Sequence, residues 1–120
     1  MNSLTFNAIE LNPIPQNDSQ IWLSSSELAN ALGYKSTDSV SRIFDRNSDE
    51  FTNGMTLTVN LTVSNKKNEL QEVRTRIFSL RGCHLIAMFA RTSVAKEFRK
   101  WVLDILDKEV GQPIITTIDP

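Results

Sequence analysis

The 120-residue chain has the size of one domain, and its 40% hydrophobic and 22% charged residues are typical of a globular protein. No apolar run reaches the roughly 18 residues that a membrane-spanning helix needs, and the first ten residues do not resemble a signal peptide. Cys83 is the only cysteine, which excludes a disulfide framework within the chain, and a reducing, cytoplasmic location is expected.

Charge is distributed unevenly, although the formal net charge is only -1. Residues 1–34 contain no Lys or Arg, and all 13 basic residues lie from Lys35 to Lys108, where they outnumber nine acidic ones. A net charge this close to zero argues against strong non-specific binding to nucleic acid. The basic remainder permits a local contact with phosphates, and it also fits an ordinary solvated surface.

Short apolar segments at the start of the chain predict an N-terminal hairpin. Leu4, Phe6 and Ala8 alternate with polar residues, as in a strand with one buried face. Residues 12–18 have the Pro- and Asn-rich composition of a turn, and residues 21–23 form a second short apolar strand. We therefore expect residues 21–23 to pair with the first strand.

The next segment predicts two helices joined by a tight turn. Ser24 or Ser25 can cap the first helix, and Glu27 has capping-box spacing from Ser24. Gly33 ends this helix as a left-handed residue. A second helix starts within residues 36–38, and its apolar face consists of Val40, Ile43 and Phe44.

Residues 56–78 carry the clearest strand pattern. The first strand alternates apolar with polar residues, which predicts that one face is buried. Its apolar residues are Leu57, Val59, Leu61 and Val63. Residues 65–68 form the tip of a hairpin, and the returning strand places Glu72, Arg74 and Arg76 on one face.

Two further helices follow the hairpin. Ser79 can cap a short helix that breaks at residues 91–93. The last helix has helical spacing of large apolar residues, and Phe98 and Trp101 are expected to be largely buried against the sheet. A Gly-Gln-Pro sequence at 111–113 is expected to end it near residue 110, which predicts a domain over 1–111 and a tail or linker over 112–120.

The order of elements is therefore ββ-α-α-ββ-α-α, an α+β fold with two antiparallel β-hairpins and four helices packed on one face. The first helix pair is helix-turn-helix-like, because the small Ala29 lets two helices approach and Gly33 allows a sharp turn. The same pair also fits an ordinary helical hairpin within a core.

Residue patterns for catalysis, cofactor binding or metal binding are not found. The sequence lacks a Gly-rich phosphate loop and a nucleophile elbow. Cys83 and His84 are adjacent on a predicted helix, so their side chains diverge by about 100° and do not form a metal-ligand pair. We therefore expect a protein that is not an enzyme and that uses no cofactor and no metal.

Basic and hydroxyl side chains supply the candidate contacts to DNA. Arg and Ser can hydrogen-bond base edges or phosphates, and a β-ribbon with a basic face can lie along a groove. The candidates are Lys35, Ser39, Ser41, Arg42 and Arg46 around the second helix, and Lys66, Lys67, Arg74 and Arg76 in the hairpin. Both sets also fit a solvated surface, which is the simpler interpretation of Lys96, Arg99 and Lys100 on the last helix.

Two short segments carry a family resemblance. Residues 95–102 read Ala-Lys-Glu-Phe-Arg-Lys-Trp-Val, and residues 26–34 read Ser-Glu-Leu-Ala-Asn-Ala-Leu-Gly-Tyr. The segment 95–102 resembles the Ala-Lys-x-Phe-x-x-Trp-Val sequence of the Bro-N family, the N-terminal domain of phage antirepressors and baculovirus Bro proteins. The segment 26–34 is similar to that family's Val-Ala-x-x-Leu-Gly-Tyr sequence, and the resemblance extends over residues 5–110.

The resemblance implies a phage or prophage regulatory protein that binds DNA and acts as an antirepressor without catalysis. An alternative is a small inhibitor that binds a phage repressor or a host protein, for example a defence protein. A homodimer is compatible with both interpretations, and neither implies a membrane partner.

Overall fold

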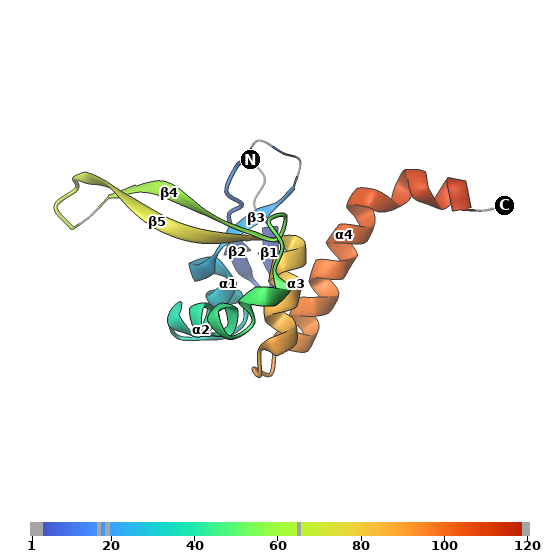
Figure 1. The fold of residues 1–120 in the computed structure, drawn as a ribbon, viewed down its shortest axis with the longest axis horizontal. Coiled ribbons are helices and arrows are strands. Elements are labelled where there is room, and N and C mark those ends of the chain that lie inside the picture. The colour runs from blue at the N-terminus through green and yellow to red at the C-terminus, as the bar shows by residue number, and fades with distance from the viewer. Residues whose placement is uncertain (1–3, 17, 19, 65, 119–120) are drawn as a thin grey trace.

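The computed structural model of the chain describes residues 4–16, 18, 20–64 and 66–118, with side chains up to residue 108. Two antiparallel sheets and four α-helices confirm the predicted α+β class (Figure 1). The elements are β1 (Leu4–Phe6), β2 (Ile9–Leu11), β3 (Trp22–Ser24), α1 (Ser25–Ala31), α2 (Asp38–Arg46), the 3-10 turn η1 (Ser48–Glu50), β4 (Thr56–Ser64), β5 (Leu70–Ser79), α3 (Leu80–Phe89) and α4 (Ala95–Ile118).

The N-terminal hairpin is shorter than predicted, and the expected pairing of residues 21–23 with the first strand is wrong. β1 pairs with β2 instead, through a two-residue turn in which Asn7 and Ala8 have φ values of 51° and 67°. Two consecutive positive φ angles are the geometry of a type I′ turn, which matches the twist of a tight hairpin. β3 pairs with β5, so its residues belong to the other sheet.

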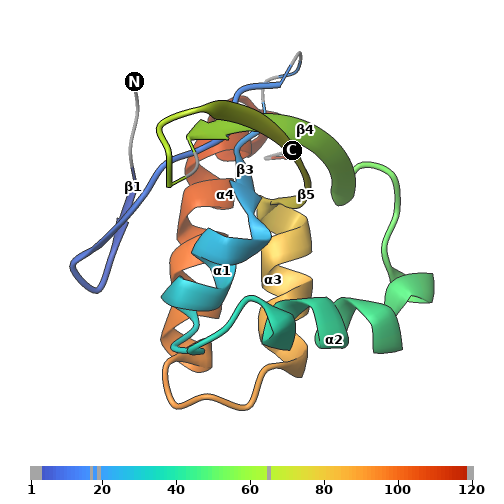
Figure 2. The ribbon, with the colours of Figure 1, turned by 90° about the vertical axis from the view of Figure 1, so that its left-hand side faces the viewer.

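The second sheet has the strand order β3-β5-β4. The helices lie on one side of it, as predicted, with α1 and α3 directly beneath the base of the sheet (Figure 2). β3 covers only the last three residues of β5, with Trp22 opposite Ser79 and Ser24 opposite Ile77. The main core lies in this region and includes Leu23, Leu28, Phe78, Ile86 and Phe98, all with no exposed surface.

Beyond this base, β4 and β5 project from the domain as a two-stranded ribbon, here called the β-ribbon (residues 56–79; Figure 1). The prediction that one face of this strand is buried is wrong, because Leu57 near the base and Val63 near the tip are 36% and 39% exposed. Within the described part of the chain, helices α1 and α3 contact the ribbon through β5. The alternating pattern therefore continues along the ribbon beyond the reach of these helices.

Hydroxyl caps fix the starts of two helices as predicted. Ser24 Oγ accepts the Glu27 N–H at 3.1 Å at the start of α1, and Ser79 Oγ accepts the Gly82 N–H at 3.3 Å at the start of α3. Gly33 has a φ of 86° just after α1, which confirms the predicted left-handed residue. The second helix starts at Asp38, within the predicted interval.

α4 packs against α3 and the N-terminal hairpin. Phe98 is fully buried and Trp101 is half-buried, and their rings lie 5.2 Å and 5.5 Å from the Phe6 ring of β1. The predicted helix end near residue 110 is wrong, because α4 continues through Pro113 to Ile118. A proline inside a helix removes one hydrogen bond and bends the helix without necessarily ending it. The far part of α4 points away from the domain (Figure 1).

Candidate nucleic-acid interface

One face of α2 packs into the domain and the opposite face is open to solvent. Val40 is fully buried and Phe44 is half-buried. On the outer side, Ser41, Arg42 and Arg46 are exposed, whereas Ser39 is half-buried. The exposed side of α2 also carries Asp38 and Asp45, and Lys35 is exposed in the turn before the helix.

The register of the β-ribbon defines its two faces. Cross-strand partners such as Thr58 and Arg76, or Asn60 and Arg74, put even-numbered residues of both strands on one face. This even-numbered face contains Thr56, Thr58, Asn60, Thr62, Glu72, Arg74 and Arg76. The predicted grouping of Glu72, Arg74 and Arg76 is therefore confirmed.

Both arginines of this face are held by threonine hydroxyls of the neighbouring strand. Arg76 Nη1 donates to Thr56 Oγ1 at 3.1 Å, and Arg74 Nη2 donates to Thr58 Oγ1 at 3.3 Å. These partners are neutral, so the hydrogen bonds position the guanidinium groups without cancelling their charge.

Arg76 also connects the ribbon to α2. Its guanidinium carbon lies 4.1 Å from the centroid of the Phe44 ring, in a cation–π arrangement. Phe44 in turn contacts the rings of Phe51 at 5.0 Å and Phe78 at 6.1 Å. This aromatic cluster sets the position of the ribbon base relative to α2. Sequence reasoning did not assign Phe44 or the two threonines to the site, and the register that places Thr58 opposite Arg76 is known only from the structure.

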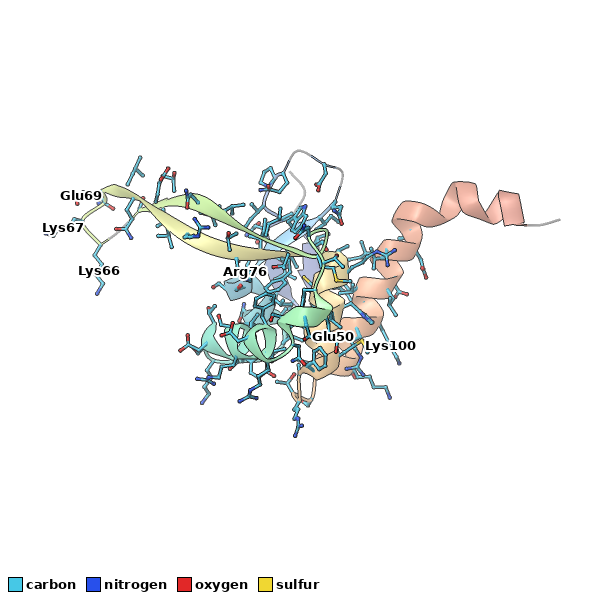
Figure 3. The ribbon with its side chains drawn as sticks, in the orientation of Figure 1. Glu50, Lys66, Lys67, Glu69, Arg76 and Lys100 are labelled. Atoms are coloured by element: carbon cyan, nitrogen blue, oxygen red, sulfur yellow. The ribbon has the colours of Figure 1, made fainter. Side chains whose placement is uncertain are left out.

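The predicted site residues are therefore only partly brought together. Arg76 brings the basic face of the ribbon next to α2 through its contact with Phe44, whereas Lys66 and Lys67 lie at the far tip of the ribbon (Figure 3). At about 3.3 Å per residue, nine residues of strand and turn place Lys67 up to roughly 30 Å from Arg76. The tip lysines and α2 can contact one ligand only if that ligand is long.

A second basic group, on α4, differs from its prediction. Lys96 and Lys100 are exposed, as expected of a solvated helix face. Arg99 is instead half-buried, and its Nη1 donates to the Ala87 carbonyl near the C-terminal end of α3 at 3.2 Å. The Ala87 carbonyl also accepts the Ala90 N–H at 3.3 Å. Carbonyls in the last turn of a helix attract a cation, so Arg99 links the two helices.

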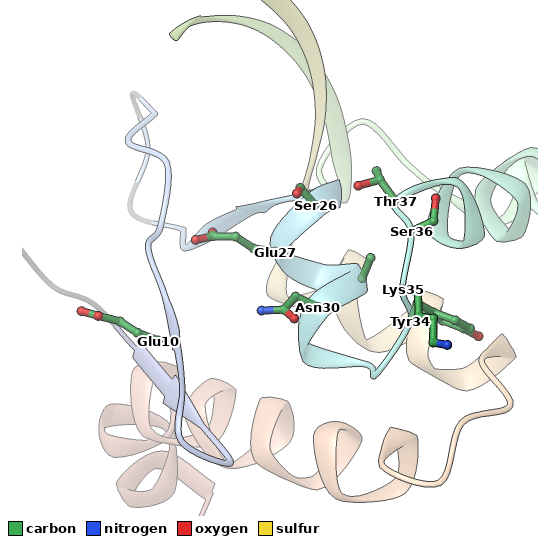
Figure 4. Close-up of a pocket in the computed structure, with 9 residues that line it drawn as sticks. Glu10, Ser26, Glu27, Asn30, Tyr34, Lys35, Ser36 and Thr37 are labelled. Carbon is green, nitrogen blue, oxygen red and sulfur yellow. The ribbon is translucent and has the colours of Figure 1, made fainter. Parts of the chain in front are cut away.

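A polar pocket of about 350 Å³ is lined by residues of β2, of α1 and of the turn between α1 and α2 (Figure 4). Glu10, Glu27, Asn30 and Lys35 are among its lining residues. Glu27 Oε2 accepts the Asn12 N–H at 2.8 Å, while Oε1 is buried and has no hydrogen-bond partner among the residues that the structure describes. Burial raises the pKa of Glu27, and the bond from Asn12 opposes that rise. Two carboxylates against the single Lys35 make this pocket unfavourable for a phosphate.

Cys83 and His84 are packed within the domain, on α3. Cys83 is fully buried in α3, its Sγ lies 3.7 Å from the Phe78 carbonyl oxygen, and burial raises the pKa of the thiol far above its usual range. His84 is half-buried, and burial together with the positive charge of Arg99 lowers its pKa. Within the described residues, His, Cys, Asp and Glu side chains form no group of three or more that could hold a metal ion.

Comparison with known proteins gives one result. The sequence matches the model of the BRO family, N-terminal domain, over residues 12–108, which include the segments 26–34 and 95–102. No curated protein and no solved structure matches the chain. Among the helices of the described residues, none has the length and apolar character needed to cross a membrane. Because the family match covers most of the sequence, the chain belongs to the BRO family through that family's N-terminal domain.

Proposed function

We propose that this domain is a phage or viral regulator that binds DNA through the exposed side of α2 and the even-numbered face of the β-ribbon. It acts by binding without catalysis, as an antirepressor does. The observation that carries this proposal is the stacking of Arg76 on Phe44, because it joins a basic strand face to an exposed helix bearing two arginines.

Family membership supports a viral or phage regulatory domain of the DNA-binding type. The structure adds an arrangement suited to that role. An α-helix fits the major groove, and a two-stranded ribbon can lie along a groove or the phosphate backbone. The ribbon reach of roughly 30 Å is close to the 34–36 Å length of one turn of duplex.

Each group has a separate role in the proposal. Arg42 and Arg46, on the exposed side of α2, approach base edges or phosphates. Arg74 and the tip residues Lys66 and Lys67 contact the backbone and fix the register of the protein on the duplex. Arg76 orients the ribbon through Phe44, so it is a positioning residue as much as a contact.

The charge balance predicts moderate affinity. The two arginines of α2 are matched by Asp38 and Asp45, and the ribbon carries four basic residues against Glu69 and Glu72. Because few phosphates are neutralised, binding is expected to be strong only at low salt unless base contacts add to it.

Fluorescence anisotropy with labelled duplex at about 50 mM salt tests the proposal. The variants Arg42→Ala/Arg46→Ala and Lys66→Ala/Lys67→Ala should each weaken binding at least tenfold. The control Lys96→Ala/Lys100→Ala removes the same charge from exposed positions of α4 and should change affinity less than threefold. Equal losses in all three variants would show that only net charge matters and would refute a defined interface.

A second candidate function is inhibition of a phage repressor or a host protein. The observation in its favour is the odd-numbered face of the ribbon, where Leu57, Val63 and Val73 are 36–39% exposed. Exposed apolar patches often mark protein interfaces. Purification from infected or lysogenic cells separates the two functions, since a DNA-binding domain retains material absorbing at 260 nm and an inhibitor retains a stoichiometric protein.

A further inference from the structure

The outer edge of β4 has none of the features that normally protect an edge strand. β4 is at the edge of the sheet, and its nine residues pair with β5 in a continuous register without a bulge. Its sequence, Thr-Leu-Thr-Val-Asn-Leu-Thr-Val-Ser, contains no charged residue and no proline. Charges, prolines and bulges are the usual means by which proteins prevent such an edge from pairing with another strand.

The hydrogen-bond pattern shows which backbone groups of β4 are available. Ser79 N donates to the Met55 carbonyl, and these residues continue the register of the ribbon. Hydrogen-bonded pairs alternate along an antiparallel ladder, so the odd-numbered residues of β4 bond to β5. The N–H and C=O groups of Thr58, Asn60 and Thr62 therefore point away from β5, toward the open edge.

This edge is complementary to itself about Asn60. When two copies of β4 run antiparallel with Asn60 opposite Asn60, Leu57 lies beside Val63 of the second copy and Val59 beside Leu61. On the other face, Thr58 lies beside Thr62. Apolar side chains thus meet apolar ones, hydroxyls meet hydroxyls, and no like charges are opposed, all of which stabilise cross-strand pairing.

The open edge of β5 is less suitable. Ser25 Oγ already donates to the Arg76 carbonyl on that side at 2.9 Å, and β3 occupies the row beside Ile77 to Ser79. A second ribbon paired there would run into β3. The corresponding row beside β4 is not occupied by any strand of the described chain.

We propose that the chain forms a two-fold symmetric dimer in which β4 of one copy pairs antiparallel with β4 of the other, centred on Asn60. The two ribbons then form one four-stranded sheet, and the interface is the same on both copies, as a closed dimer requires. Pairing brings Leu57 and Val63, now more than a third exposed, against apolar neighbours.

The dimer has a consequence for DNA binding that rests on the proposed function, whereas the edge pairing does not. A two-fold axis perpendicular to the sheet leaves the even-numbered faces of both ribbons on the same side. Arg74 and Arg76 of both copies then face one duplex together, and the expected target is a site with two-fold symmetry.

Cysteine cross-linking tests the register. Asn60→Cys places two thiols opposite each other in a hydrogen-bonded pair, where Cα atoms lie about 5.5 Å apart, within the range a disulfide can bridge. Thr58→Cys is the matched control on the same strand face, and its two copies lie about 13 Å apart along the strands. Cys83 is fully buried, so the introduced cysteine is the accessible thiol in each variant.

Under mild oxidation we expect Asn60→Cys to form a covalent dimer at least tenfold faster than Thr58→Cys. Equal rates for the two variants would overturn the proposed register. Sedimentation of the unmodified chain should show twice the 13.6 kDa monomer mass. We expect a dimer Kd of about 50 µM or lower, so a chain that is still monomeric at a tenfold higher concentration, about 0.5 mM, would overturn the dimer.

Asn60→Pro provides an independent test. Its N–H points outward, so proline blocks pairing without removing a bond to β5, and proline is tolerated on edge strands. The variant should remain folded by circular dichroism and should sediment as a monomer. A folded variant that still dimerises would place the interface elsewhere. If the unmodified chain dimerises as described but binds no duplex, the proposed function fails and this inference stands.

Discussion

Gly82 provides a sharp test of how the base of the β-ribbon is held. It lies in the first turn of α3, and a Cβ atom added there would overlap the Met55 carbonyl oxygen, lie 3.1 Å from the Met55 carbonyl carbon and lie 3.3 Å from Phe78 Cβ. The same carbonyl accepts the Ser79 N–H at 3.0 Å, and Met55 directly precedes β4. Gly82→Ala must therefore displace backbone where the ribbon leaves the domain.

Two opposing effects set the magnitude. Alanine in place of glycine favours a helix by about 1 kcal/mol. Overpacking typically costs about 1–3 kcal/mol, and weakening the Ser79–Met55 hydrogen bond adds about 1 kcal/mol. We expect Gly82→Ala to lower the free energy of unfolding by about 1–3 kcal/mol, measured by urea denaturation.

Gly54→Ala is the control, because its added Cβ meets only Thr52 Oγ1 at 3.8 Å, an ordinary contact. Its free energy of unfolding should change by less than about 0.5 kcal/mol. If Gly82→Ala is as stable as the unmodified chain, or if both variants lose the same stability, the reasoning about this contact is refuted.

Three further predictions concern single residues. Gly33→Ala should lose about 1–2 kcal/mol of stability in urea, because φ is 86° there, and an unchanged midpoint would contradict that geometry. Glu27→Gln should stabilise the domain more at pH 7 than at pH 4, because the raised pKa of Glu27 means that its carboxyl destabilises the folded state once pH rises through that pKa and ionises it. A difference in unfolding free energy between the two proteins that does not change with pH would contradict this prediction. Arg76→Ala should lose about 1 kcal/mol by thermal unfolding, through its contact with Phe44, while Arg74→Ala should lose less than about 0.5 kcal/mol; equal losses would argue against the contact.

Local signals in the sequence were enough to predict most elements. The caps at Ser24 and Ser79, the left-handed Gly33 and the two faces of the long hairpin were all predicted correctly, because each depends on residues a few positions apart. Those features are set by the backbone preferences of individual residues and by periodicity.

Features that depend on distant partners were not predictable in the same way. Residues 21–23 were assigned to the wrong sheet, because a short apolar strand does not encode its partner and the turn at Asn7 and Ala8 lacks the usual glycine. Alternation in β4 indicated a strand correctly but could not show that Leu57 and Val63 on its apolar face stay more than a third exposed. Of the candidate site, the charged residues were found, whereas the Phe44–Arg76 contact needed the fold to bring α2 to the ribbon.

The salt dependence of duplex binding tests the central claim most directly. The observed binding constant of the unmodified chain should fall linearly with salt on a double-logarithmic plot, and Arg74→Ala should reduce the slope by about 0.9, the value for one lost phosphate contact. Lys100→Ala, on α4 and outside the proposed interface, should leave the slope unchanged (Figure 3). Absence of binding at about 50 mM salt, or a slope that responds equally to both substitutions, would contradict a DNA interface on α2 and the β-ribbon.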